Sequence, residues 1–246
     1  MDTVQSSIQN KLLRLLSVED FNLLAPDLVY VTFSVRDQIE VAGRTIEHAI
    51  FLEDGISSTV AKSPQGRDVE VGLTGYDGVT GTSLVLGGES TPLSVYIQLA
   101  GSGYRIAADK FLLAVEKSRS LEQVLLRYIQ SMVIQTATTA LVNGQADAET
   151  RLARWLLMVH DRSSGHNLQL THEFMSVMLG VRRPWVTETL HLLEGKGYIR
   201  STRGNVSIHD RVGLVAEAGG FYGVAEREYE KLLGVSLSKT CGFDRR

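Results

Sequence analysis

The chain has 246 residues, enough for two modest domains that each bury a core. Its hydrophobic content of 43% and charged content of 22% are ordinary for a water-soluble globular protein. No apolar run approaches the roughly 20 residues that a membrane helix needs, and the N-terminus has no secretory-signal pattern. The single cysteine, Cys241, excludes an internal disulfide and an iron–sulfur cluster ligated by cysteines of one chain. We therefore expect a cytoplasmic protein that does not bind membranes.

The net charge of −3 conceals an asymmetry along the chain. Residues 1–150 carry 11 Lys and Arg against 18 Asp and Glu, whereas residues 151–211 carry 9 against 5 and hold five of the six histidines. A basic segment that follows an acidic one is typical of a chain in which one domain binds phosphates and the neighbouring domain does not bind DNA. An ordinary solvated surface is the alternative.

The first half is predicted to be mainly β-structure after a short helical start. Residues 10–25 are rich in leucine and read as helical up to Pro26. From Leu28 to Phe111, short apolar alternations are separated by glycines at 43, 55, 66 and 78, near the interval expected of turns in a small sandwich or barrel. His48 is expected to be an ordinary surface or hydrogen-bonded histidine rather than a haem or metal ligand.

Residues 118–142 predict one long helix with an unusually broad apolar surface. One line of mostly apolar residues, here called the seam, runs along this helix, and Ile129 and Val133 widen it. The seam consists of Leu121, Val124, Leu125, Tyr128, Met132 and Thr139. Packing on its own domain would explain one apolar face, but the breadth favours a helix from a second subunit, and we predict a homodimer seam here. Residues 143–145 read as a hinge.

The next helix is predicted over residues 148–161, with Trp155 in the core and Arg151 and Arg154 facing outward. After a polar loop, Thr171 is a suitable helix N-cap, and Phe174, Met175, Met178 and Leu179 fall on one helical face. Gly180 ends this helix because glycine readily takes the left-handed conformation of a C-cap.

A second short helix follows the turn. Arg182, Arg183 and Pro184 open it, and Val186, Leu190 and Leu193 form its buried stripe. Two helices around a tight turn predict a helix–turn–helix, whose second helix enters the DNA major groove. Any helical hairpin would share the apolar spacing, but the two arginines and the hairpin that follows favour DNA binding.

Two alternating segments, residues 198–201 and 206–208, flank the sequence Thr202-Arg203-Gly204-Asn205 and predict a wing. A C-terminal helical extension should then break at Gly219-Gly220, resume over residues 222–233 and pack on the winged domain.

With these parts in this order, the chain resembles the Crp–Fnr family of bacterial transcription regulators, whose DNA-binding signature residues 170–199 match without a gap. The resemblance implies an α+β fold: an N-terminal β-roll (residues 1–117), a long dimerisation helix (118–144) and a C-terminal winged helix–turn–helix with its extension (145–246). It implies a homodimer on a two-fold symmetric site in double-stranded DNA, with RNA polymerase as a further partner.

The chain departs from the cyclic-nucleotide-binding members of that family. Their phosphate cassette has a glutamate between glycines and then an arginine, whereas this chain has Gly78-Val79-Thr80-Gly81 and Glu89-Ser90-Thr91-Pro92. Lys and Arg are absent from residues 68–104. Burying a phosphate without a cation is costly, so cyclic AMP and cyclic GMP are not expected as effectors. No residue predicts a cofactor or a metal.

The resemblance also assigns DNA contacts. Arg183 falls on the first base-reading arginine of the family, while Pro184 and Glu188 replace a glutamate and an arginine, so the operator should differ from the best-known one. The residues predicted to read bases are Arg183, Trp185, Thr187, Glu188 and His191. The residues predicted to contact the DNA backbone are Thr171, His172, Arg182, Lys196 and Arg203.

We therefore predict a dimeric transcription regulator rather than an enzyme. The alternative is an effector-binding β-roll protein whose winged domain mediates protein contacts. Three carboxylates of the β-rich half, Asp68, Glu70 and Asp77, are expected on the solvated surface rather than in acid–base catalysis.

Overall fold

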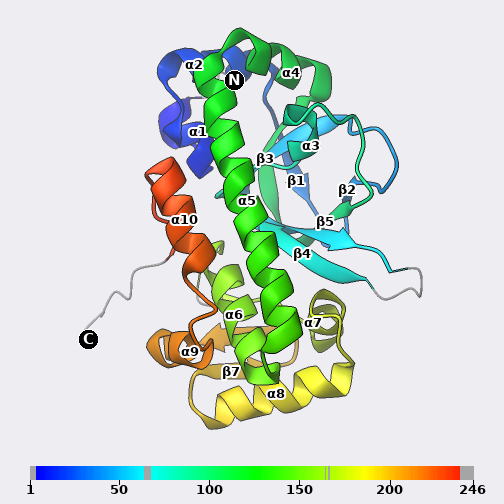
Figure 1. The fold of residues 1–246 in the computed structure, drawn as a ribbon, viewed down its shortest axis with the longest axis vertical. Helices are drawn as coiled ribbons and strands as arrows, with labels where there is room; N and C mark the ends of the chain where they lie inside the picture. The colour runs from blue at the N-terminus through cyan, green and yellow to red at the C-terminus, as the bar shows by residue number, and fades with distance from the viewer. Residues whose placement is uncertain (1–3, 64–67, 164, 166, 239–246) are drawn as a thin grey trace.

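The computed structural model describes residues 4–63, 68–163, 165 and 167–238, so that Gly66 and Cys241 lie outside the described residues. It has a rolled sheet at one end, a small winged domain at the other, and one long helix, α5, along both (Figure 1). The helical elements before α5 are η1 (Gln5–Ser7), α1 (Lys11–Leu15), α2 (Val18–Leu24), η2 (Ala25–Asp27), α3 (Thr82–Val85) and α4 (Ala108–Lys117). The expected N-terminal helix is thus two helices, because Ser17 caps a new one by accepting a hydrogen bond from the Asp20 backbone N–H.

The N-terminal sheet is antiparallel, with the strand order β1-β5-β3-β4 and with β2 also paired to β5. Its strands are β1 (Val29–Phe33), β2 (Gln38–Glu40), β3 (His48–Ala61), β4 (Val69–Thr74) and β5 (Ser94–Ala107). The long strands β3 and β5 shift register between Leu52 and Ser57, where Gly55 and Gly101 meet. A Cβ atom on Gly101 would lie 2.2 Å from the Asp54 carbonyl oxygen, so the close approach that bends the sheet requires glycine.

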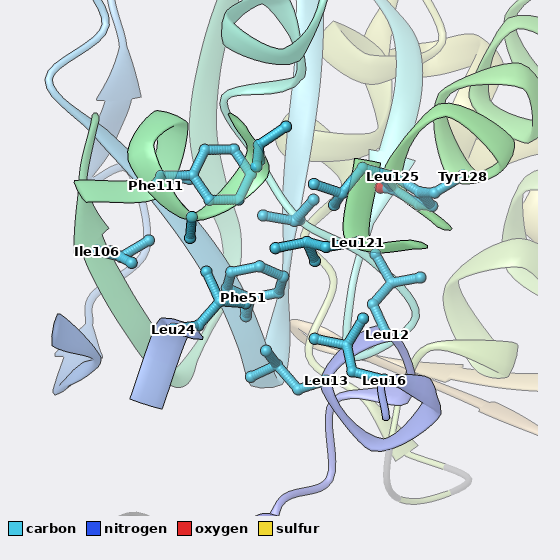
Figure 2. Packing of buried hydrophobic residues seen from close by; sticks show 14 of the residues in the cluster. Leu12, Leu13, Leu16, Leu24, Phe51, Ile106, Phe111, Leu121, Leu125 and Tyr128 are labelled. Carbon is cyan, nitrogen blue, oxygen red and sulfur yellow. The ribbon is translucent and has the colours of Figure 1, made fainter. Parts of the chain in front are cut away.

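The main core of this half lies between the sheet and the helices α1, α2, α4 and α5 (Figure 2). Phe51 from β3 and Phe111 from α4 meet edge to face with their ring centroids 6.1 Å apart. Leu121, Leu125 and Tyr128 of α5 (Arg119–Gln145) complete this cluster and are almost completely buried. The prediction that these three residues form the dimer seam is therefore wrong, because their side chains fill the core of their own subunit.

The remaining seam residues also face their own chain. Val124 and Met132 are partly buried against the same cluster. Thr139 donates a hydrogen bond to the Gln135 carbonyl and accepts one from Arg154. The predicted hinge at residues 143–145 is helical as well, since α5 continues to Gln145.

The C-terminal half is a winged helix–turn–helix with its own core. Its elements are α6 (Ala148–Asp161), β6 (Asn167–Leu168), α7 (His172–Met178), α8 (Arg183–Gly195), β7 (Ile199–Thr202), β8 (Asn205–Ile208), α9 (Arg211–Glu217) and α10 (Val224–Leu233). The three strands pair antiparallel in the order β6-β8-β7. Trp155 lies in the core as expected, but Arg154 is also buried, at 4% exposure, instead of facing outward.

The C-terminal extension does not stay on the winged domain. The chain turns at Gly219 and Gly220, both with positive φ, and α10 runs back along α5 (Figure 1). Tyr229 joins the N-terminal core, and its hydroxyl donates a 2.7 Å hydrogen bond to the Asp77 carbonyl. The prediction that this helix packs on the winged domain is therefore wrong. Helix α10 packs against α5 and the core of the sheet domain instead.

Two of the carboxylates expected on the surface are buried where the two halves meet. Asp77 forms an ion pair of 3.0 Å with Arg162 at the end of α6, and both side chains are nearly inaccessible to solvent. Glu70 of β4 accepts a 2.8 Å hydrogen bond from Trp155 Nε1 of α6. The solvated-surface prediction fails for both residues, since helix α6 covers this side of the sheet.

Candidate DNA-binding site

The first helix of the predicted motif, α7, begins as the sequence predicted. The Thr171 hydroxyl accepts a 3.1 Å hydrogen bond from the Phe174 backbone N–H, so it caps the helix N-terminus. Gly180 ends the motif's first half with φ +63°, which glycine takes without strain. A Cβ atom there would also lie 2.9 Å from Val69 Cγ2 of β4. The tight turn of the motif therefore rests directly on the sheet domain.

The second helix, α8, has one buried and one exposed face. Its buried side chains are Val186, Thr189, Leu190 and Leu193. Arg182, Arg183, Glu188 and His191 are exposed, and Thr187 is half-buried between them. Arg182 is the N-cap residue and makes no side-chain capping bond, so the Arg183 and Trp185 N–H groups of the first turn receive no side-chain cap, while Pro184 has no N–H.

His172 and Thr187 link the two helices. His172 Nδ1 lies 2.9 Å from the Thr187 hydroxyl, which also donates to the Arg183 carbonyl at 3.3 Å. Partial burial and the positive charges of Arg183 and His191 lower the pKa of His172. The contact with His172 therefore holds Thr187 in place on the face of α8 that carries Arg183 and Glu188.

Two predicted contact residues have other partners. Trp185 is half-buried against the domain core, with the Arg151 guanidinium 5.5 Å from its ring centroid. Lys196 forms ion pairs with Glu149 and Glu217, and hydrogen bonds to these carboxylates raise its pKa. Its charge is therefore already matched within the chain, which weakens the case for a phosphate contact.

The wing is a hairpin of two four-residue strands that pairs Ile199 with Ile208 and Thr202 with Asn205. Gly204 has φ +75° at its tip, where the chain must reverse, and Arg203 is exposed beside it. Arg203 has no acidic partner within ion-pair distance among the described residues.

The outer side of α5 carries an exposed apolar stripe, of which only Val133 was named from the sequence. Leu126, Val133 and Leu141 are 36%, 54% and 47% exposed although their neighbours on the helix are buried. Together with Gln130, Ala137 and Gly144 they lie on one face of the helix, at successive spacings of four, three, four, four and three residues. The signal was present as a second apolar stripe, but spacing alone could not say which stripe faces the subunit's own core.

The sheet domain has a small cavity of about 50 Å³ at the position of the expected phosphate cassette. Glu40 lines it, and its carboxylate accepts a 2.7 Å hydrogen bond from the Gly81 N–H. Burial raises the pKa of Glu40. The retained glycines have structural reasons, since a Cβ atom on Gly78 would lie 2.0 Å from the Tyr128 hydroxyl and Gly81 has φ +72°.

A rolled antiparallel sheet joined by a long helix to a winged helix–turn–helix defines a transcription regulator fold with a helix–turn–helix DNA-binding domain. Residues 150–217 match the model of the Crp-like helix-turn-helix domain. A comparison with curated proteins by sequence found no match.

Solved structures of regulators are similar to most of the chain, and one of them is described as a member of the crp/fnr family. A regulator described as crp/fnr family from Eubacterium rectale is 16% identical with a TM-score of 0.65, over 85% of this chain and 98% of its own. FixK2 from Bradyrhizobium japonicum is 16% identical with a TM-score of 0.67, over 77% and 96%. A c-di-GMP responsive regulator from Xanthomonas campestris is 13% identical with a TM-score of 0.62, over 78% and 99%.

The chain therefore has the fold of the Crp/Fnr transcription regulators and carries their helix–turn–helix domain, which confirms the predicted resemblance. Two of the similar structures are described as transcriptional regulators of the CRP or crp/fnr family. In the described part of the chain, none of the helices is long and apolar enough to cross a bilayer.

Proposed function

We propose that the protein is a dimeric, sequence-specific DNA-binding transcription regulator that acts in the cytoplasm without control by cyclic AMP. The exposed face of α8 is the observation that carries the proposal. It presents Arg183, Thr187 and Glu188 beside uncapped N–H groups, whereas the opposite face is held in the domain core. Arginine can donate two parallel hydrogen bonds to guanine, and glutamate can accept one from cytosine N4.

The proposed contacts to the DNA backbone involve residues of the helix–turn–helix and of the wing. Thr171, His172 and Arg182 lie at the helix–turn–helix, and Arg203 lies on the wing. Lys196 takes at most a secondary part, because Glu149 and Glu217 bind its ammonium group. Trp185 borders the reading face and supports it by packing.

The proposed dimer uses the exposed stripe of α5 that includes Leu126, Val133 and Leu141. Its spacing of three and four residues suits a short helix–helix seam, and its large apolar side chains are exposed in the single subunit. A symmetric pair of α5 helices would present two recognition helices to half-sites about one DNA turn, roughly 34 Å, apart. Recruitment of RNA polymerase by this dimer is a further part of the proposal.

Independence from cyclic AMP is supported by the cavity in the sheet domain. The cavity is small, Glu40 supplies an acid, and none of the described Lys and Arg residues lines it. A cyclic phosphate placed there would lose its hydration without gaining a cation. Other effectors are compatible with the fold: the similar Xanthomonas regulator is described as responsive to c-di-GMP.

The test of base reading compares wild-type protein with Arg183→Ala on a set of point-mutated operators. The variant should bind the intact operator about 1–3 kcal/mol more weakly and lose its preference at one base pair in each half-site. If both proteins rank the mutated operators alike, Arg183 does not read a base. Steep weakening of binding as salt rises separates DNA binding from the alternative, in which the winged domain contacts proteins.

The test of the dimer is Val133→Glu, measured by sedimentation. The variant should be a folded monomer, because a charge would be buried in the proposed seam. Val212→Glu is the matched control, since Val212 is a 59% exposed valine on α9 away from the stripe. A dimer that survives Val133→Glu would exclude this seam.

A further inference from the structure

A small cavity of about 20 Å³ lies where the winged domain meets the sheet domain. Strand β4, the last turns of α5, helix α6 and the end of α7 surround it. Arg151 and Arg154 line it from α6, and Glu70 lines it from β4. Its other lining residues in the described part of the chain are apolar or uncharged. A cavity of this size has room for about one particle as large as a water molecule.

The two arginines carry N–H groups that the described residues leave without an acceptor. Arg154 is 4% exposed, and its Nε and Nη1 donate at 3.2 Å to the Phe221 carbonyl and the Thr139 hydroxyl. Arg151 is half-buried, and its Nη2 donates to the Leu179 carbonyl at 2.7 Å. Arg154 Nη2 and Arg151 Nε are buried, and neither has a hydrogen-bond partner among these residues. Because the two arginines are three positions apart on α6, they lie on the same side of the helix.

The positive charge at this cavity is not matched by an adjacent carboxylate. Neither Arg151 nor Arg154 is in an ion pair among the described residues. Burial lowers the pKa of Arg154 and the charge of Arg162 adds to this, whereas the charges of Glu226 and Glu70 act in the opposite direction. The Glu226 carboxylate accepts its hydrogen bond from the N-terminus of its own helix, α10. A buried guanidinium without a close anion is costly, so an anion from outside the chain would be stabilising here.

The donors, the charge and the size together define the ligand. A water molecule can accept hydrogen bonds from both guanidinium groups, but it leaves their charge unmatched. An anion does both, and hydrogen bonds between charged partners are the stronger ones. Sulfate, phosphate and carboxylate compounds consist of several heavy atoms and exceed a cavity of about 20 Å³. A monatomic anion, of which chloride is the common example, is only slightly larger than water.

We propose that this cavity binds a single chloride-sized anion, with Arg154 Nη2 and Arg151 Nε as its donors. The donors belong to α6 of the winged domain, and the opposite walls belong to β4 and α5. A bound anion therefore stabilises the arrangement in which the two domains are docked. The inference goes beyond the proposed function and does not depend on it, because the site needs no DNA.

The Glu70 carboxyl makes this binding depend on pH. Burial raises the pKa of Glu70 to about 7, so this group is mostly neutral at pH 5.5 and mostly charged at pH 8.5. A charged carboxylate in the same cavity repels the anion and matches part of the arginine charge itself. The other ionisable groups near the two arginines and Glu70 are Arg162, Glu226, Tyr96 and Asp68.

The experiment measures thermal unfolding of the full-length protein in sodium chloride and in sodium gluconate of equal ionic strength. The gluconate anion is too large for the cavity, so the difference between the two melting temperatures, here called the chloride shift, reports the site. At pH 5.5 the chloride shift should rise to saturation, and a tenfold excess of chloride over its dissociation constant should add about 3–6 °C. At pH 8.5 it should be smaller.

Four variants locate the effect. Arg154→Met removes a guanidinium but keeps an unbranched side chain, and it should abolish the chloride shift. Arg151→Met should reduce the shift, and it serves as the second test if Arg154→Met does not fold. Arg44→Met is the matched control and should behave as wild type, because Arg44 is exposed and does not line the cavity. Glu70→Gln should give the same chloride shift at both pH values.

An equal chloride shift in wild type, Arg154→Met and Arg151→Met would overturn the inference, since chloride would then act on the surface. The absence of a saturating shift in wild type would also overturn it, because the cavity would then hold water only. An equal shift at pH 5.5 and pH 8.5 would exclude a site beside Glu70. Crystals grown in bromide should show anomalous scattering beside Arg154 and Arg151, and scattering only at other positions would contradict the assignment.

Discussion

The pH dependence of stability should be dominated by one buried carboxyl group, that of Glu70. Its Oε2 lies 2.6 Å from the Ser58 hydroxyl oxygen, which lies 2.5 Å from Gln98 Oε1. The Ser58 hydroxyl has only one proton for these two oxygens. If Glu70 is protonated, its carboxyl donates to Ser58 and Ser58 donates to Gln98, so all three groups are hydrogen-bonded. Burial is the main cause that raises the Glu70 pKa to about 7, whereas hydrogen bonds that Ser58 and Trp155 can donate to the ionised carboxylate and the nearby charges of Arg162 and Arg154 lower it.

The sign of the effect follows from this raised pKa. The folded state keeps the Glu70 proton up to a pH of about 7, whereas the unfolded chain loses it near the ordinary value of 4.5. The stability contribution is therefore complete below pH 4.5 and is lost as the pH rises through 7. A shift of this size corresponds to roughly 3 kcal/mol in total, of which about 2.5 kcal/mol is lost between pH 5 and pH 8.

The perturbation that isolates this group is Glu70→Gln. The glutamine carbonyl can still accept from Trp155 Nε1, and its amide can donate to Ser58, so the packing is retained. Urea unfolding at pH 5, 6, 7 and 8, followed by two probes, gives the free energy of each protein. The two proteins should be similar at pH 5, and the variant should be more stable by about 2.5 kcal/mol at pH 8. A constant difference at every pH would refute this reasoning.

Three further substitutions test the packing and the domain junction. Asp77→Asn leaves the buried Arg162 guanidinium without its anion and should lower the unfolding free energy by about 3–5 kcal/mol, measured by urea denaturation. Leu125→Ala should cost about 2–5 kcal/mol because the side chain is in the core, whereas the neighbouring Leu126→Ala should cost little in a monomeric background; similar losses would contradict the assignment of the two faces of α5. Gly78→Ala should reduce the melting temperature, since its Cβ atom would overlap the Tyr128 hydroxyl, and an unchanged melting temperature would show that this packing yields easily.

The order of elements could be predicted from the sequence because local signals marked their ends. The Thr171 cap, the Gly180 turn and the Gly204 tip each lie where the pattern placed them. Such signals depend on a few neighbouring residues, so they survive without knowledge of the tertiary fold.

The partners of each face could not be predicted in the same way. Helix α5 has two apolar stripes, and spacing alone does not say that Leu125 packs on its own sheet while Val133 is left exposed. Helix α10 has an apolar stripe that fits either domain. Its actual place depends on Tyr229 reaching Asp77, a contact between residues 152 positions apart.

The buried charges and the cavity at the domain junction could not be predicted from the sequence either. Glu70 and Asp77 resemble surface residues by composition, and only the position of α6 over the sheet buries them. Glu70 and Arg154 are far apart in the sequence, and the two line one cavity because the domains are docked side by side.

The most direct test of the central claim is selection of binding sites from a random duplex DNA library by the purified full-length protein without added ligand. We predict enrichment of a two-fold symmetric site whose half-sites lie about one helical turn apart. We also predict that Arg183→Ala enriches a relaxed version of that site. Recovery of sequences without a shared motif would contradict the claim that this protein reads DNA in the form described.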